Sequence, residues 1–238
     1  MARQGNGAAY LMSNLSQGCP FTNYPYTISI WHYKPASTAS YAVFGYGSSS
    51  INTYSMMYSS GTALYLYING TQDGNGWNTS VGWNHYAWRC ASSTDRSIII
   101  NGSVVNLSTS ISMLAGLNRY GVMCSPQSTP TYYMGSGERV AELGIWNANI
   151  SNTDLISIYT NKMSPLMLSR NSLVTYCPLN DGDGGARDLI GGRNLTESGI
   201  ATLVDHPPFY LYKRSLFRAF SPQLSLSSYN SIFHGSVF

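Results

Sequence analysis

The sequence predicts an all-β sandwich with one short helix and an extended C-terminal arm. Aromatic residues make up 13% of the 238 residues, with 19 Tyr and 23 Gly, and this composition is typical of short strands joined by turns. Charged residues make up only 10%, whereas helical proteins carry more Glu and Lys. Short segments of alternating polarity, separated by turn residues, recur up to about residue 146. This spacing indicates a sandwich or jelly roll.

The predicted strands follow one another at short intervals. The segment YTISIWHY (26–33) alternates, with Ile28, Ile30 and His32 on one face and Trp31 and Tyr33 on the other. Further strands are predicted at 41–47, 53–58, 63–70, 85–91, 96–102, 119–125, 139–147 and 173–179. Asn101-Gly102 predicts a tight turn, from which the segment SVVNL returns. The Gly-rich segment 72–76 predicts a turn or loop.

One helix is predicted over residues 152–161. Ser151 and Asp154 have the spacing of a capping box, with Ser151 as the N-cap. Apolar residues follow at helical spacing, and Pro165 prevents continuation.

The charge distribution divides the chain into a sandwich (1–205) and an arm (206–238). Ten Lys or Arg balance ten Asp or Glu up to Asp205, and the formal net charge of +3 comes from the residues after it. A neutral body argues against a nucleic-acid surface. The arm lacks steady periodicity but carries aromatic and basic residues with which it could bind a partner: Phe209, Tyr210, Tyr212, Lys213, Arg214, Phe217, Arg218 and Phe220.

The cysteines and the N-terminus favour a protein made in the cytoplasm. Cys19, Cys90, Cys124 and Cys177 form no CxxC motif, and we expect them to be reduced, with Cys90 buried in a strand. The N-terminus has no apolar stretch of the signal-peptide kind, and no apolar run has the length of a membrane span.

His85, between Trp83 and Trp88, is the first candidate for chemistry. It could act as a general base or a metal ligand, but no Asp or Glu lies at partner spacing. We therefore expect a structural histidine that is held by a hydrogen bond beside core aromatics.

The ten acids do not form a catalytic pattern. A retaining glycosidase holds two carboxyl groups about 5–5.5 Å apart. Glu138 and Glu142 share one face of a predicted strand, but a spacing of four residues separates them by about 13 Å. We expect them to be charges on the rim, and we expect no enzymatic activity.

Asp181 and Asp183 are the metal candidates. Acids that alternate on a Gly-rich loop suit Ca²⁺, which takes several oxygen ligands. The alternative is an ordinary turn, because Asp-Gly is common turn chemistry. No other cofactor is expected.

Trp77 is the sugar-binding candidate, together with Asn75 and Asn78. In a loop, Trp77 could stack on a sugar ring while the two amides bind its hydroxyls. The alternative is that its ring plugs the edge of the sandwich.

Four segments in order resemble the laminin-G or concanavalin A-like (pentraxin-like) jelly-roll superfamily. They are YTISIW (26–31), WNHYAW (83–88), SIIINGSVV (97–105) and VAELGIWNANISNTDLISIY (140–159). The resemblance covers residues 8–165, and it implies a structural role for the hairpin that carries His85. It also implies the calcium and sugar sites that such domains often hold.

The C-terminal part looks like the ending of laminin-G-like proteins of tailed bacteriophages. LVTYCPLNDGDGGARDLIGGRNLTESG (173–199) and DHPPF (205–209) carry this likeness, although Cys177 stands where such proteins often have Trp. It implies a virion location and a non-enzymatic capsid decoration protein. Its partners would be the major capsid protein, other virion proteins and further copies of the chain. The alternative is a lectin-like module of a phage fibre or of a secreted protein, which binds a glycan or a receptor.

Overall fold

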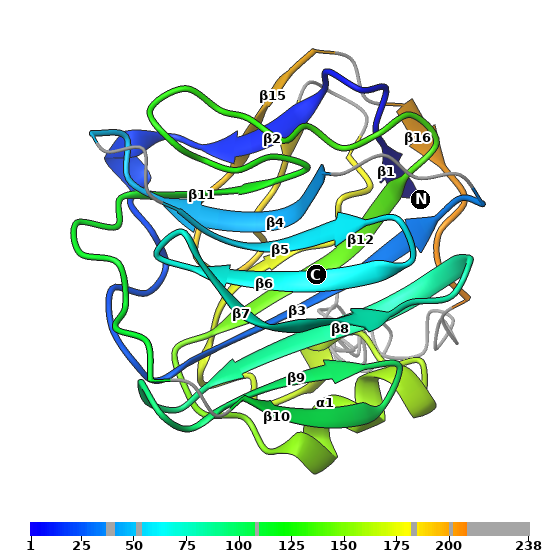
Figure 1. The fold of residues 1–238 in the computed structure, drawn as a ribbon. Coiled ribbons are helices and arrows are strands. Elements are labelled where there is room, and N and C mark those ends of the chain that lie inside the picture. The colour runs from blue at the N-terminus through cyan, green and yellow to red at the C-terminus, as the bar shows by residue number, and fades with distance from the viewer. Residues whose placement is uncertain (37–40, 51–53, 108–109, 182–184, 200–201, 209–238) are drawn as a thin grey trace, which may run out of the picture.

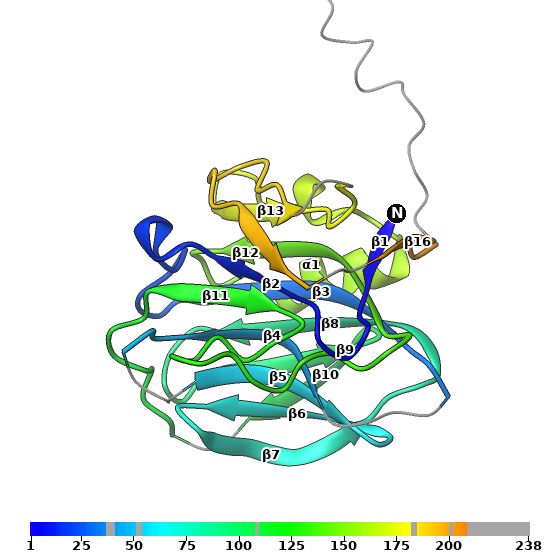
Figure 2. The ribbon, with the colours of Figure 1, turned by 90° about the horizontal axis from the view of Figure 1, so that it is seen from above.

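The computed structural model describes residues 1–36, 41–50, 54–107, 110–181, 185–199 and 202–208 (Figure 1). Its strands form two antiparallel sheets that pack face to face as a β-sandwich. Figure 2 shows the layers, with β7 and β13 on opposite sides of the molecule. The predicted fold class is therefore confirmed.

The first sheet follows the order β10-β9-β8-β3-β12-β1-β16, and β13 also pairs with β12. Its strands are β1 (Ala2–Gln4), β3 (Tyr26–Lys34), β8 (Gly82–Cys90), β9 (Arg96–Ile100), β10 (Ser103–Leu107), β12 (Arg139–Trp146), β13 (Leu173–Cys177) and β16 (Thr202–Val204). The predicted strands for β3, β8, β9, β12 and β13 lie within a few residues of these bounds.

The second sheet follows the order β14-β15-β2-β11-β4-β5-β6-β7. Its strands are β2 (Tyr10–Ser13), β4 (Tyr41–Gly47), β5 (Tyr54–Ser60), β6 (Ala63–Ile68), β7 (Thr71–Asn78), β11 (Arg119–Val122), β14 (Gly185–Ala186) and β15 (Leu195–Ser198). Consecutive hairpins join β4 through β7, and these strands stand in front in Figure 1.

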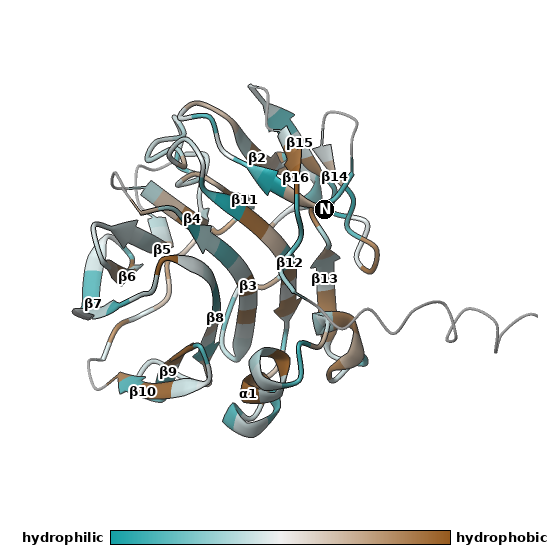
Figure 3. Cartoon of the chain, turned by 90° about the vertical axis from the view of Figure 1, so that its right-hand side faces the viewer, coloured by the Kyte–Doolittle hydropathy of each residue, from teal (hydrophilic) through white to brown (hydrophobic). Residues whose placement is uncertain are grey.

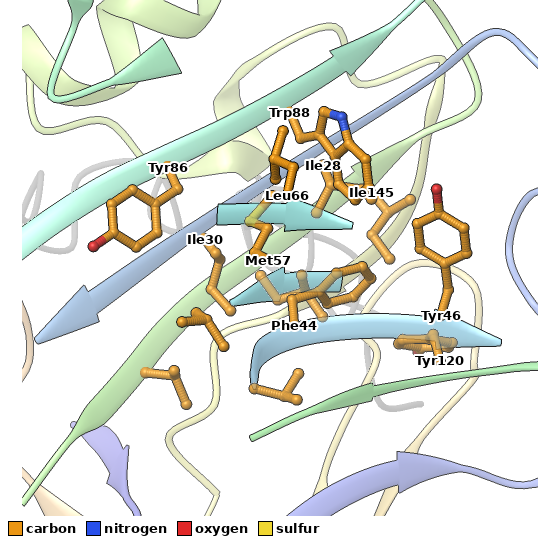
Figure 4. Packing of buried hydrophobic residues seen from close by; sticks show 14 of the residues in the cluster. Ile28, Ile30, Phe44, Tyr46, Met57, Leu66, Tyr86, Trp88, Tyr120 and Ile145 are labelled. Atoms are coloured by element: carbon orange, nitrogen blue, oxygen red, sulfur yellow. The ribbon is translucent and has the colours of Figure 1, made fainter. Parts of the chain in front are cut away.

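The core lies between the two sheets, where the inward side chains of both meet. Ile28 and Ile30 of β3 face Phe44 and Met57 of the other sheet, around the buried Trp88 (Figure 4). The alternation predicted for β3 is confirmed, because Ile28 and Ile30 belong to the core between the sheets and His32 bonds to Tyr86 of the same core, whereas Trp31 packs in a separate cluster on the other face.

Strand β7 corrects the sequence prediction of a loop at 72–76. Gly74 and Gly76 have positive φ angles of 95° and 81°, and the pairing of β6 with β7 shifts register between Leu64 and Leu66. Because β7 ends the sheet, a bulge and two glycines disturb only one ladder of hydrogen bonds. The glycines were therefore wrongly interpreted as a chain break.

Helix α1 (Asn152–Thr160) lies on the outer face of the first sheet, away from the second (Figure 3). The Ser151 hydroxyl accepts the Asp154 N–H at 3.1 Å and donates to the Asp154 carboxylate at 2.8 Å, which confirms the predicted cap. Leu155 and Ile158 pack with Trp146 of β12.

Two short 3-10 helices, η1 (Leu15–Gln17) and η2 (Pro165–Met167), complete the described elements. None of the described helices has the length and apolar character to span a membrane.

Candidate functional site

Five tyrosines gather on the outer face of the second sheet, and we call this cluster the tyrosine face. Outward positions alternate along β5 and β6, and two tyrosines of each strand occupy them. The fifth comes from the loop that precedes β12. The members are Tyr54, Tyr58, Tyr65, Tyr67 and Tyr132.

The rings form one continuous group centred on Tyr58. Its centroid lies 6.5 Å from that of Tyr65, 5.8 Å from Tyr67 and 5.6 Å from Tyr132. Tyr54 closes the group, at 6.4 Å from Tyr67 and 5.9 Å from Tyr132. Each ring is partly open to solvent, and Tyr132 is 42% exposed. The arrangement is a broad aromatic platform that is fixed by mutual packing.

Tyr132 reaches this platform through a strained backbone. Its φ is 54°, a left-handed conformation that few non-glycine residues adopt. The Tyr132 carbonyl accepts the Ala42 N–H at 2.8 Å, and Ser125 and Thr131 form an isolated bridge next to it. The surrounding loop thus holds Tyr132 in place, as is common at functional positions.

Glycine in β7 makes room for Tyr65. A Cβ at Gly76 would lie 2.5 Å from Cε1 of Tyr65, so the ring rests directly on the backbone of β7. The Gly-rich segment therefore supports one side of the tyrosine face.

Two members of the tyrosine face have a raised pKa. Burial raises the pKa of Tyr54 to about 12, and the adjoining Tyr132 adds to the rise. Burial also raises the pKa of Tyr67. The Tyr67 hydroxyl donates to Oε1 of Gln72 at 3.3 Å, and Nε2 of Gln72 donates to the Gly74 carbonyl at 2.7 Å. The face thus combines aromatic surface with phenol and amide groups.

The predicted sugar-binding residues lie on β7, but they do not form the tyrosine face. Trp77 is half-buried and packs against the core, with its indole 2.6 Å from the position of a Cβ at Gly74. Trp77 thus covers the edge of the sandwich, which was the alternative to sugar stacking. The expectation that Trp77 lies in a loop is wrong, because it belongs to β7. Asn78 is exposed at the end of β7, and the side chain of Asn75 lies outside the described part. A sugar contact by these residues stays a prediction.

The calcium candidates are described only in part. The Asp181 carboxylate accepts the Arg187 N–H at 2.7 Å, whereas Asp183 lies outside the described residues. In the described part of the chain, no group of three or more His, Cys, Asp or Glu could hold a metal ion. The calcium site stays a prediction.

His85 is a structural residue, as predicted. Its Nε2 shares a hydrogen bond of 2.8 Å with the Ser29 hydroxyl, and its ring lies 5.2 Å from that of Trp31. Burial, with a smaller effect from Lys162, lowers the pKa of His85 to about 3. A group that stays neutral in a closed environment does not serve as a proton acceptor near neutral pH.

Glu138 and Glu142 correct the prediction of rim charges, because they are only 1% and 5% exposed. Glu138 points into the sandwich and bonds to His32. Glu142 occupies a bulge with φ of 57° and points outward, where Tyr176 and His206 bond to its carboxylate at 2.7 and 3.0 Å. The bulge breaks the alternation from which a shared face was predicted.

The predicted arm residues Phe209, Tyr210, Tyr212, Lys213, Arg214, Phe217, Arg218 and Phe220 all lie outside the described residues. Of the residues before them, His206 bonds to Glu142 and Pro207 is buried. The role of the arm stays a prediction.

Sequence reasoning missed the tyrosine face, although its signal is visible. TYSMMY and ALYLY both place Tyr at alternate or i, i+4 positions, which share one face of a strand. The contribution of Tyr132, more than sixty residues further on, is visible only in the fold.

Comparison with known proteins shows the fold. No protein-family model matches the chain, and no curated protein sequence matches it. A solved structure of a putative carbohydrate-binding protein from Bacteroides ovatus is similar, with TM-score 0.59 and 12% identity over 86% of this chain. This chain spans 60% of the length of that protein.

Two further solved structures are similar. The carbohydrate-binding module CBM40 of the IT-sialidase from Ruminococcus gnavus, bound to α2,3-sialyllactose, has TM-score 0.52 and 11% identity, over 67% of this chain and 97% of that one. A pentraxin from Limulus polyphemus has TM-score 0.45 and 11% identity, over 67% of this chain and 85% of that one. The two sheets of this chain and the first two similar structures show a jelly-roll β-sandwich fold.

Proposed function

We propose that this protein is a non-catalytic, lectin-like carbohydrate-binding module and that the tyrosine face is its binding surface. The observation that carries the proposal is the platform itself, in which five partly exposed rings are packed together in fixed positions. The faces of aromatic rings are electron-rich and attract the slightly positive C–H groups of a sugar ring. The phenol hydroxyls and Gln72 supply hydrogen bonds that can orient sugar hydroxyls.

The shape of the platform favours a neutral glycan of several sugar units over a single terminal sugar. The rings spread over two strands and a loop, and burial raises the pKa of Tyr54 and of Tyr67, which keeps these two rings protonated at neutral pH. The similar structures named as carbohydrate-binding support the fold as a suitable scaffold for this function.

The experiment is a glycan array with the full chain, followed by calorimetry on the best neutral ligand. Tyr58→Ala removes the central ring and is expected to weaken binding by about 2 kcal/mol, as for a binding hot spot. Tyr159→Ala is the matched control, because Tyr159 lies on α1, on the far side of the sandwich.

Equal affinity of the Tyr58 and Tyr159 variants would show that the tyrosine face is not the binding surface. Binding that falls with Trp77→Ala instead would move the site to β7, as the sequence predicted.

The capsid-decoration role stays a prediction from the resemblance to phage proteins, as do the virion location, the capsid partners and self-association. The similar structures and the described residues do not bear on it.

A further inference from the structure

A second set of binding groups lies in a row across the outer face of the first sheet, at the end that α1 leaves open. Each residue of this row is directly opposite the next in the antiparallel register, so all of them point to the same side. At about 4.8 Å between strands, five strands give a row about 19 Å long. We call it the Arg139 row, and its members are Trp83, Tyr33, Arg139, Gln4 and Thr202.

The row combines aromatic, cationic and neutral polar groups. The rings of Tyr33 and Trp83 meet edge to face, with centroids 5.6 Å apart. The guanidinium carbon of Arg139 lies 4.5 Å above the Tyr33 ring. Thr202 is exposed and the other members are partly exposed. A ligand at the surface can therefore reach them all.

The row rests on a rigid base. The next row along the same face contains Trp31 and Ala141, which are buried and pack together. The partly buried Trp83 packs against this cluster. Residues that are supported in this way keep their positions before a ligand arrives, which lowers the entropic cost of binding.

Arg139 differs from the arginines that form structural ion pairs. Arg3, Arg89 and Arg96 each pair with a carboxylate. Among the described residues, the Arg139 side chain has no hydrogen bond or ion pair, and its Nε is buried without a partner. The guanidinium lies over the Tyr33 ring, and its two terminal nitrogens, Nη1 and Nη2, can donate two parallel hydrogen bonds to an anion.

A second cation adds to the positive potential of this face. Lys162 places its ammonium 5.0 Å from the Trp31 ring, next to the row. An anionic ligand is therefore favoured here, whereas the tyrosine face is neutral.

We propose that the Arg139 row binds an acidic oligosaccharide, one that carries a carboxylate or sulfate beside a sugar ring. The acid group pairs with the fork of Arg139, the sugar rings lie on Tyr33 and Trp83, and Gln4 and Thr202 bond to hydroxyls. This site is separate from the tyrosine face and does not depend on it. The protein then has two glycan surfaces of different charge preference on opposite sides of the sandwich.

The test is calorimetry with the full chain and three variants. The acidic probes are an oligogalacturonate and a heparin-derived oligosaccharide, and the neutral probe is a galactose oligomer of the same length. Arg139→Gln and Arg139→Lys are each expected to weaken binding of an acidic probe roughly tenfold or more. Gln removes the charge, and Lys keeps the charge but lacks the planar fork of the guanidinium. Arg170→Gln makes the same charge change at an exposed turn and should leave binding unaltered. Circular dichroism checks that each variant is folded.

Several outcomes would overturn the proposal. One is no binding of either acidic probe at millimolar concentration, and another is equal affinity for the Arg139→Gln and Arg170→Gln variants. Equal binding of polyglutamate or a DNA oligonucleotide would show that the row selects charge and not sugar. Tyr58→Ala should leave this binding intact, so a failure of the tyrosine face is distinguishable from a failure of the Arg139 row.

Discussion

The contact between Gly76 and Tyr65 makes the architecture of the tyrosine face testable without a ligand. In Gly76→Ala, the new methyl group would lie 2.5 Å from Cε1 of Tyr65, whereas carbon atoms in contact are about 3.5–4.0 Å apart. The ring must therefore move by about 1 Å or more. The φ of 81° adds strain, since a left-handed conformation costs an L-residue about 1–2 kcal/mol.

Gly116→Ala is the matched control. Gly116 has a φ of 68°, and a Cβ there would have nothing within 4 Å. It carries the backbone strain without the clash, so we expect a loss of about 1–2 kcal/mol in unfolding free energy. Because an overpacked contact costs about 1–3 kcal/mol more, Gly76→Ala should lose about 2–5 kcal/mol.

Urea denaturation measures both losses, and NMR shifts of the Tyr58 ring report the geometry of the tyrosine face. Tyr58 lies 6.5 Å from Tyr65, so displacement of Tyr65 alters the ring-current field at Tyr58. Gly76→Ala should shift the Tyr58 resonances and Gly116→Ala should not. Equal stability of the two variants together with unchanged Tyr58 shifts would refute the packing described for β7.

Two further predictions concern the buried charged and titratable groups. Asp73 of β7 and Arg96 of β9 form a buried bidentate ion pair, with hydrogen bonds of 3.1 and 3.2 Å. Asp73→Asn leaves the Arg96 charge buried without its ion-pair partner, so it should lower the unfolding free energy by about 3–5 kcal/mol in urea denaturation. Replacing both residues by apolar ones should cost clearly less, and equal losses for the single and the double variant would contradict this coupling. The pKa of His85 is lowered to about 3, so its folded form binds fewer protons than the unfolded form, and its contribution to stability falls as pH drops from about 6.5 toward 3. Its ring protons should show no NMR titration between pH 8 and pH 5, and a midpoint near 6.5 would show that the site is open to water.

Local patterns were enough for most of the elements. Alternation along YTISIWHY set the inward and outward sides of β3, because successive side chains of a strand point to opposite faces. Ser151 and Asp154 marked the start of α1, since a capping box satisfies N–H groups within four residues. The structural role of His85 was predicted from the lack of acids near it in sequence, and in the fold its ring bonds to the Ser29 hydroxyl.

The same local rules failed where a distant contact decided the outcome. Gly74 and Gly76 indicated a loop, but edge pairing with β6 and the rings of Trp77 and Tyr65 make the segment a strand. Glu138 and Glu142 were placed on one face because the bulge at Glu142 is not visible in the sequence.

Both proposed surfaces consist of residues that meet only in the folded chain. Tyr132 joins the β5 and β6 tyrosines through a loop held to β4, and the Arg139 row takes its members from five strands between Gln4 and Thr202. The alternation of side chains along a strand is a local property, so the composition of each strand's outer side can be read directly from the sequence. The register between strands depends on the packing of the whole sandwich, and the tertiary structure alone decides which outer side chains become neighbours.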